Sequence, residues 1–359
     1  MCEQKKLKVW VTGGYFDNSG ECFIQEVDIL QKTKSDVIRF IPSDNLLIPR
    51  KGFTGATWMS EPGKSDLLVC GFCSLFRFSP PHWNFSGVLH QPCMNDLHHV
   101  AVNDQKIFIV NTGLETIDIF DKSGFFTGSY SFHPAWFNKE RQNGITPSAE
   151  NRSSSLKAGW QEHSFSITDA PPLAGYYQGG KGSFHQKFLR DFVHLNHVTV
   201  LPNQILATSL SHQCVYNVCN FNRVIEHTPG YPHDGLVHNG NFWITCVNGI
   251  IVAYKIENGI VTNKITYLKN IFEHTEHRGW CRGIMIQDKY VIIGITEIRK
   301  STQHYWASYP WDSTKTGIIC WDFLHNEPVS FVDLTEKRQS KIFSIIKRPH
   351  TLQYRPNKF

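Results

Sequence analysis

The sequence has no run of apolar residues long enough to cross a membrane as a helix, which takes about 18 in succession. The N-terminus carries charge, but the apolar segment after it has no small-residue cleavage site like that of a secretory signal peptide. These two absences predict a cytoplasmic protein that does not act at a membrane.

Charge of one sign is not concentrated anywhere along the chain. The 36 basic and 31 acidic residues give a formal net charge of +5 and are scattered. Proteins that bind nucleic acid usually carry a basic stripe, and only the short segment 337–350 comes near to one. No nucleic-acid partner is therefore predicted, and an oligomeric state cannot be predicted from the sequence.

Several common signatures are also missing. No stretch of about 12 residues has clear helical periodicity, and the G-x-S-x-G, H-E-x-x-H and G-x-x-x-x-G-K-[ST] motifs are absent. The ten cysteines could suggest disulfides, but several lie within apolar strand patterns, which favours buried reduced thiols. Cys70 and Cys73 have C-x-x-C spacing without a second pair, so they are interpreted in the same way.

What the chain does contain is a repeat of strand, tight turn and strand. Four such segments align without gaps, and an apolar β-branched residue anchors each of them: Val102, Val200, Val237 and Ile286. Each hairpin is followed by a third apolar segment and often by a fourth. Four antiparallel strands per repeat is the construction of a propeller blade.

Counting the units predicts an all-β protein, a six-bladed β-propeller, with seven blades as the alternative. The N-terminal segment 6–30 has strands but no inner hairpin of its own, so the two chain ends are expected to complete one blade together. Such closure removes exposed sheet edges. The chain, 1–359, is interpreted as one propeller domain, and the long aromatic-rich insert at 133–190 is predicted to cover one end of the channel as a lid.

Polar residues recur at equivalent positions in the four aligned inner strands. Because the innermost strand of each blade lines the channel, these residues are expected to meet around the axis. Alternation along a regular strand would divide them into two sets, and the sequence leaves open which set faces the channel. One set is His98, Asn196, His233 and Arg282, and the other is His99, His197 and Asp234.

Histidines that converge on one axis predict a metal site, because imidazole is the commonest protein ligand of zinc and related metals. The candidate ligands of a divalent transition metal (zinc, iron or manganese) are His98, His99, His197 and His233, with Asp234 or Asn196 as a further ligand or an orienting partner. A hydrogen-bonded histidine plug in the channel is the alternative.

Arg282 stands among apolar residues, where an unpaired charge would be costly. Its guanidinium suits a carboxylate or phosphate, and an internal ion pair with Asp234 or Glu297 is the alternative. These residues predict a metal-dependent lyase or hydrolase that acts on a small, polar, anionic substrate; the competing class is a non-catalytic propeller that binds a ligand or a protein. The candidate catalytic residues are His194, Asn196, Asp234 and Arg282.

The repeated segments resemble a family of uncharacterised bacterial β-propeller proteins, from about residue 50 to the end without the insert. That resemblance implies the fold and a histidine, asparagine, histidine and arginine at His98, Asn196, His233 and Arg282, but no established activity. More distantly, 233–244 is similar to the gluconolactonase and senescence-marker-protein propellers, whose axial calcium site is built from oxygen ligands. The histidine-rich plan resembles peptidylglycine amidating lyase, a six-bladed propeller with an axial zinc held by three histidines, and the propeller polysaccharide lyases.

Overall fold

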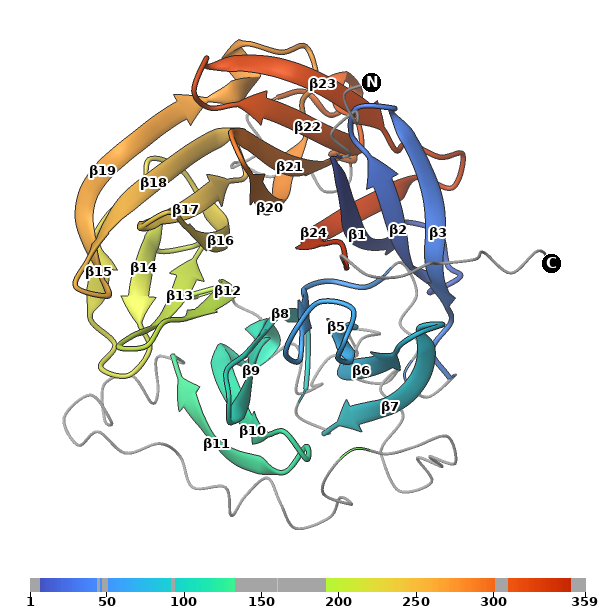
Figure 1. Ribbon diagram of the computed structural model, residues 1–359, viewed down its shortest axis with the longest axis vertical. Coiled ribbons are helices and arrows are strands. Elements are labelled where there is room, and N and C mark those ends of the chain that lie inside the picture. Colours follow the sequence, from blue (N-terminus) through green and yellow to red (C-terminus); the bar gives the residue numbers. More distant parts are fainter. Residues whose placement is uncertain are drawn as a thin grey trace.

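Six four-stranded antiparallel sheets surround a central channel in the computed structural model, which describes residues 7–43, 46, 51–91, 94–132, 160, 192–300 and 309–349 (Figure 1). The fold is a six-bladed β-propeller. The predicted all-β class and the count of six are confirmed, and the alternative of seven blades is excluded. The insert at 133–190 lies outside the described residues apart from Trp160, so the lid stays a prediction.

Blades 1 to 5 each consist of four consecutive strands, which follow one another from the channel outward. Blade 1 is β4 (Ala56–Trp58), β5 (Leu67–Cys70), β6 (Ser74–Ser79) and β7 (Asn84–His90). Blade 2 is β8 (Leu97–Val102), β9 (Lys106–Asn111), β10 (Thr116–Asp121) and β11 (Phe126–Ser131). Blade 3 is β12 (Leu195–Val200), β13 (Ile205–Ser209), β14 (Cys214–Asn217) and β15 (Arg223–Ile225). Blade 4 is β16 (Pro232–His238), β17 (Asn241–Cys246), β18 (Ile250–Glu257) and β19 (Ile260–Asn270), and blade 5 is β20 (Trp280–Gln287), β21 (Tyr290–Thr296), β22 (Gly317–Asp322) and β23 (Glu327–Asp333).

Blade 6 joins the two ends of the chain. Its inner strand is the C-terminal β24 (Ser340–Lys347), which pairs with β1 (Lys8–Tyr15) and is followed outward by β2 (Cys22–Asp28) and β3 (Thr33–Phe40). Figure 1 shows the red β24 beside the dark blue β1. The predicted closure of the ring by both chain ends is therefore confirmed.

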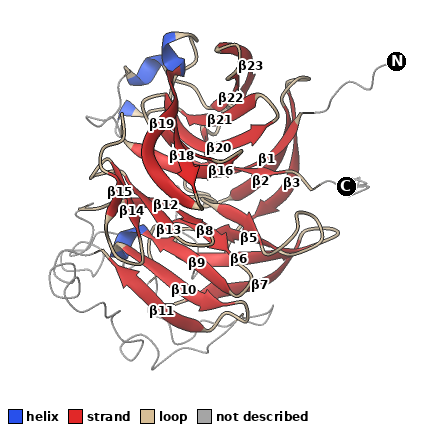
Figure 2. Cartoon of the chain, turned by 60° about the vertical axis from the view of Figure 1, so that its left-hand side comes forward, coloured by secondary structure: helices blue, strands red, loops and turns tan. Residues whose placement is uncertain are grey.

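Among the residues that the structure describes, helical structure is limited to short turns outside the blades (Figure 2). The described 3-10 turns are η1 (Thr112–Leu114), η3 (Ile271–Glu273) and η5 (Trp311–Ser313). Within the described part of the chain, no helix combines the length and the hydropathy needed to span a membrane.

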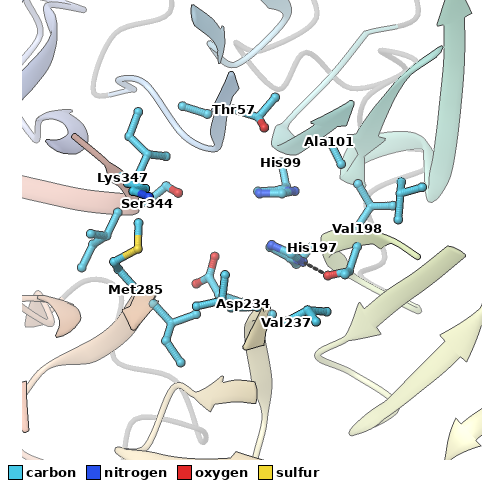
Figure 3. A pocket seen from close by; sticks show the side chains of 18 of the residues that line it. Thr57, His99, Ala101, His197, Val198, Asp234, Val237, Met285, Ser344 and Lys347 are labelled. Atoms are coloured by element: carbon cyan, nitrogen blue, oxygen red, sulfur yellow. Dashed lines mark hydrogen bonds between the residues drawn. The ribbon is translucent and has the colours of Figure 1, made fainter. Parts of the chain in front are cut away.

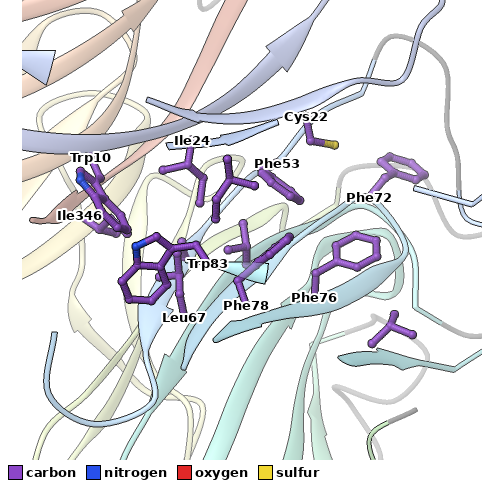
Figure 4. Close-up of a cluster of buried hydrophobic side chains, with 14 of the residues drawn as sticks. Trp10, Cys22, Ile24, Phe53, Leu67, Phe72, Phe76, Phe78, Trp83 and Ile346 are labelled. Atoms are coloured by element: carbon purple, nitrogen blue, oxygen red, sulfur yellow. The ribbon is translucent and has the colours of Figure 1, made fainter. Parts of the chain in front are cut away.

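Apolar side chains pack between neighbouring blades, and each of the six junctions has its own buried cluster. At the junction of blades 6 and 1 (Figure 4), the indole of Trp10 packs edge-on against that of Trp83, with ring centroids 5.2 Å apart. Burying one such side chain contributes about 1.5–3 kcal/mol. Because these clusters hold the blades together, the channel itself is free to carry polar residues.

Hydroxyl groups tie most blades to the inner strand of a neighbouring blade. At five junctions, a threonine donates a hydrogen bond of 2.5–3.1 Å to a backbone carbonyl at or just before the next inner strand. At the remaining junction, between blades 4 and 5, the carboxylate of Asp234 accepts a 2.6 Å hydrogen bond from the backbone nitrogen of Gly283. These bonds fix the relative positions of the side chains that the inner strands carry.

Candidate functional site

The inner strands of blades 2 to 6 each have a β-bulge, at the same aligned position in blades 2 to 4 and one residue later in blade 5. Their pairing with the next strand skips one residue at each bulge, namely His98, Asn196, His233, Gly283 and Phe343. A bulge interrupts the strict alternation of a strand and re-aims a side chain. In consequence, His98 and His99 both border cavities in the channel, although they are neighbours on one strand.

Two cavities divide the predicted residues between them. The first, of about 170 Å³, lies at the N-terminal ends of the inner strands; we call it the arginine pocket, lined by Lys51, Asp96, His98, His194, His233 and Arg282, among others. The second, of about 490 Å³, lies toward the C-terminal ends; we call it the aspartate pocket, and its polar lining includes His99, His197, Asp234 and Ser344. The two sets expected from strand alternation thus occupy different cavities of one channel.

Arg282 is a half-buried cation that has no carboxylate within ion-pair distance among the described residues. Neither Asp234 nor Glu297, nor any other described carboxylate, forms an ion pair with it within 4.0 Å, and its Nε is buried without a hydrogen-bond partner. The guanidinium lies over the ring of Phe343, 4.4 Å from its centroid. Burial lowers the pKa of Arg282 to about 10, which still leaves the group charged at neutral pH.

Besides Arg282, the lining of the arginine pocket carries one cation and one carboxylate. Lys51 Nζ lies 3.5 Å from Asp96 Oδ1. Burial alone would raise the pKa of Asp96, but Lys51 and His98 hold it well below its usual range. Lys341 is buried close by, and burial together with Lys51 and Arg282 lowers the pKa of its amine well below the ordinary value. The lining thus holds two cations and one carboxylate, and the carboxylate of Asp234, which His233 contacts, also acts on the charge of Arg282.

Asn196 links three blades behind the arginine pocket. Its Oδ1 accepts a 2.7 Å hydrogen bond from His98 Nδ1, and its Nδ2 donates a 3.1 Å bond to the carbonyl oxygen of Pro232. His98 Nε2 is directed toward Asp96, with a distance of 3.6 Å to Oδ1. The predicted catalytic Asn196 is buried, and its contacts orient the His98 ring toward the pocket.

His194 enters the arginine pocket from the turn before β12. Its backbone has a positive φ of 48°, and its nitrogen, like that of Val193, is held by Glu115 Oε1 at 3.2 and 2.7 Å respectively. The rings of His194 and His98 meet edge-on with centroids 5.3 Å apart. The predicted acid or base therefore shares a cavity with His98.

His233 and Asp234 form a pair that connects the two pockets. His233 Nδ1 donates a 2.6 Å hydrogen bond to Asp234 Oδ2, so its Nε2 is left as the proton acceptor. Burial lowers the pKa of His233 to about 4 although Asp234 opposes this. Burial would raise the pKa of Asp234, but His233 and the backbone of Gly283 hold it well below its usual range. The result is a neutral imidazole oriented by a carboxylate.

The aspartate pocket holds a stacked pair of imidazoles (Figure 3). The rings of His99 and His197 have centroids 3.7 Å apart and an angle of 31° between their planes. Burial lowers the pKa of His197 to about 4, and burial together with the nearby His197 lowers that of His99 well below 6.5. In Figure 3 the carboxylate of Asp234 and the hydroxyl of Ser344 are directed toward the same central space as these rings.

The predicted metal ligands do not converge on one point. Lone pairs of imidazole nitrogens lie in the ring plane, so the nearly parallel rings of His99 and His197 do not direct them at a common ion. His98 and His233 line the other cavity, where Lys51 and Arg282 already supply positive charge. Among the described residues, a group of three donors within 4.8 Å of one another occurs only at Asp322, His325 and Glu327, on the outer strands of blade 5. The metal stays a prediction, and the arrangement of the described side chains does not fit it.

Sequence reasoning missed several residues of the two cavities. Extending the alignment two positions upstream makes Asp96 equivalent to His194, and both have positive φ values before their strands. This alignment could have identified Asp96 from the sequence. Lys51 and Ser344 have no such signal. Lys51 precedes β4, a short inner strand outside the aligned repeat, and Ser344 lies on β24, the inner strand that the C-terminal end of the chain supplies to blade 6.

The cysteine prediction is confirmed for most of the described thiols. All of the described cysteines are free, and all except Cys219 are buried. Burial raises the pKa of Cys73 to about 12 and also raises that of Cys70, which makes both unreactive at neutral pH.

Comparisons with known proteins agree on the fold. No protein-family model and no curated protein matches the chain. A protein of unknown function from Bacteroides caccae is similar over 95% of this chain and 98% of its own, with 11% identity and a TM-score of 0.55. A chain of a nidogen/laminin complex is similar over 95% and 97%, with 8% identity and a TM-score of 0.53. A Bacteroides fragilis protein provisionally described as a 6-phosphogluconolactonase covers 92% and 82%, with 11% identity and a TM-score of 0.46. The likeness to the Bacteroides caccae protein confirms the predicted resemblance to uncharacterised propellers as a likeness of fold.

Proposed function

We propose that the arginine pocket binds a small carboxylate or phosphate and that the protein acts on this molecule by acid–base chemistry. The observation that carries the proposal is Arg282, a charged guanidinium that borders a cavity and has no carboxylate partner among the described residues. A guanidinium whose Nε is buried without a partner is costly, and a planar carboxylate or phosphate would satisfy it with two parallel hydrogen bonds.

The remaining residues of the pocket supply proton transfer. His233 is neutral, its Nδ1 is held by Asp234, and its Nε2 can take a proton from water or from a carbon next to the carboxylate of the substrate. Asp234 would stabilise the imidazolium that forms. His98 and His194 line the same cavity and can donate a proton of their own to the leaving group, while His233 gives up its proton to solvent afterwards. The predicted hydrolase or lyase class suits this set, with a molecule small enough for about 170 Å³.

Anion binding is tested first, by calorimetric titration with acetate, glycolate and inorganic phosphate. At least one of these probes should bind the wild-type protein, and Arg282→Met should weaken that binding by about tenfold or more. Arg282→Lys keeps the charge without the planar fork, so it should lose less. Equal binding by the wild-type protein and Arg282→Met would overturn the proposal.

Turnover is tested separately, with a set of small phosphate esters, hydroxy acids and sugar-acid lactones. His233→Gln should abolish any turnover found and leave binding of the anionic probe within about twofold, because an amide side chain cannot accept and pass on a proton. Anion binding without turnover of any member of the set would favour the non-catalytic propeller, in which the histidines form a hydrogen-bonded plug.

A further inference from the structure

The aspartate pocket differs from the arginine pocket in the sign of its charge. Its one ionised group at depth is Asp234, and its one lysine, Lys347, is exposed at the rim. Asp234 Oδ2 is occupied by His233 Nδ1 and the nitrogen of Gly283, but Oδ1 has no hydrogen-bond partner among the described residues. A carboxylate oxygen is thus available inside a cavity of about 490 Å³.

The groups around Asp234 are uncharged and can accept hydrogen bonds. Because burial keeps His99 and His197 uncharged at neutral pH, each ring has one lone pair and one N–H donor, and the Ser344 hydroxyl can accept or donate a hydrogen bond. Figure 3 shows these groups on different sides of one central space. The carboxylate is therefore the one charged group among them, and it favours a ligand that brings a positive charge and N–H donors.

The walls of the aspartate pocket are apolar. They include Val237, Ile284, Met285 and Ile345 from the inner strands of blades 4, 5 and 6. Cavities that combine mostly apolar walls with a few polar groups at depth are typical binding sites of small molecules, and their usual volume is about 300–1,000 Å³. The apolar part of a ligand would lie against these walls, with its polar end at Asp234.

We infer that the aspartate pocket is a second ligand site, which binds a primary amine with an apolar substituent. The ammonium group donates its hydrogens to Asp234 Oδ1 and to the acceptors beside it, and the substituent fills the space toward the rim. This site is distinct from the anion site in the arginine pocket. It lies at the C-terminal ends of the inner strands and is lined by His99 and Asp234, whereas their neighbours His98 and His233 line the arginine pocket.

The test is calorimetric titration with 2-phenylethylamine at pH 7.5, and with 2-phenylethanol as the uncharged isostere. The amine should bind, and the alcohol should bind about tenfold more weakly or not at all, because it lacks the charge that pairs with Asp234. Equal affinities for the two probes, or no binding of the amine, would overturn the inference.

Two variants locate the binding. Val237 is 38% exposed at the rim, so Val237→Trp should fill the cavity and abolish amine binding without disturbing the core. Asp234→Asn keeps the shape of the side chain and should weaken amine binding about tenfold or more. Val329→Trp, on the outer strand β23 and 40% exposed, is the matched control and should leave the affinity for the amine unchanged. Amine binding that survives Val237→Trp would place the amine elsewhere and contradict the inference, even if Asp234→Asn fails to fold.

Discussion

The two cavities of the channel are built from the same inner strands, yet they differ in charge. The arginine pocket gathers Lys51 and Arg282 around one carboxylate, Asp96, whereas the aspartate pocket places Asp234 among uncharged acceptors and apolar walls. The bulge explains how one strand serves both, because it lets His98 and His99 contribute to different cavities. A propeller channel can therefore hold two sites that differ in the sign of their charge and are lined by adjacent residues of the same strands.

Removing Asp234, which lines the aspartate pocket and contacts His233 of the arginine pocket, should have the largest effect. Asp234→Ala leaves His233 Nδ1 and the nitrogen of Gly283 without their acceptor in a buried region. The free energy of unfolding should fall by about 3–5 kcal/mol, measured by urea denaturation. Ser344→Ala, in the same cavity, is the control and should cost less than about 1 kcal/mol. Similar losses for the two variants would show that Asp234 does not link the pockets.

Acid should destabilise the protein through its buried histidines. His197 and His233 have pKa values of about 4 in the folded state and 6.5 as the reference for the unfolded chain. Between these values the unfolded chain binds protons that the folded state does not, so stability is lost as the pH falls from 6.5 toward 4. Each of the two groups contributes over about 1.5 pH units between 6.5 and 5, at about 1.4 kcal/mol per unit, so denaturation at pH 7 and pH 5 should differ by about 4 kcal/mol.

A substitution at His197 sharpens this pH prediction. His197→Gln removes one of the depressed groups, so the difference in stability between pH 7 and pH 5 should shrink by roughly half. The carboxylates Asp96 and Asp234 also have lowered pKa values, but their contribution is lost only below about pH 4. A pH dependence that is unchanged in His197→Gln would assign the acid sensitivity to other groups.

Replacing Arg282 should affect the free energy of unfolding in the opposite way to replacing Asp234. Since its Nε is buried without a partner and no described carboxylate lies within ion-pair distance, Arg282→Met should leave the free energy of unfolding unchanged or raise it by about 1 kcal/mol. Thermal unfolding in buffer without small anions measures this effect. A loss of more than about 2 kcal/mol would indicate that Arg282 has an internal partner and is not waiting for a ligand.

The smallest effect is expected from chelation. The donor atoms of the two pockets do not converge, so EDTA should leave the melting temperature of the purified protein within about 1 °C. Elemental analysis of the same sample provides the second readout. If the wild-type protein held stoichiometric zinc, iron or manganese and His197→Gln lost it, the result would support the predicted metal-dependent chemistry.

The repeat made much of the fold predictable from the sequence. The anchors Val102, Val200, Val237 and Ile286 fixed the inner hairpins, and the unmatched N-terminal strands indicated the closure of blade 6. The division of the polar residues into two sets followed from strand alternation. Their placement in two cavities did not, because it depends on a bulge that leaves no clear mark in the residues themselves.

The partners of the polar residues were beyond the sequence for a related reason. Asp96 and Lys51 reach the channel from the turns before β8 and β4, and only the folded ring brings them to Arg282. The contact of Asp234 with His233 joins neighbours on one strand, yet the side chains meet only because the bulge turns both inward. The positions of His99 and His197 in the sequence could not show whether their rings stack on each other or converge on a metal.

The central claim, two sites of opposite charge in one channel, is tested most directly by a crystal structure of the protein grown with glycolate and 2-(4-bromophenyl)ethylamine. Glycolate oxygens should lie within about 3.2 Å of the Arg282 guanidinium. The bromine anomalous peak should lie in the aspartate pocket, with the ammonium group at Asp234. Both probes in one cavity, or the amine beside Arg282, would contradict the claim.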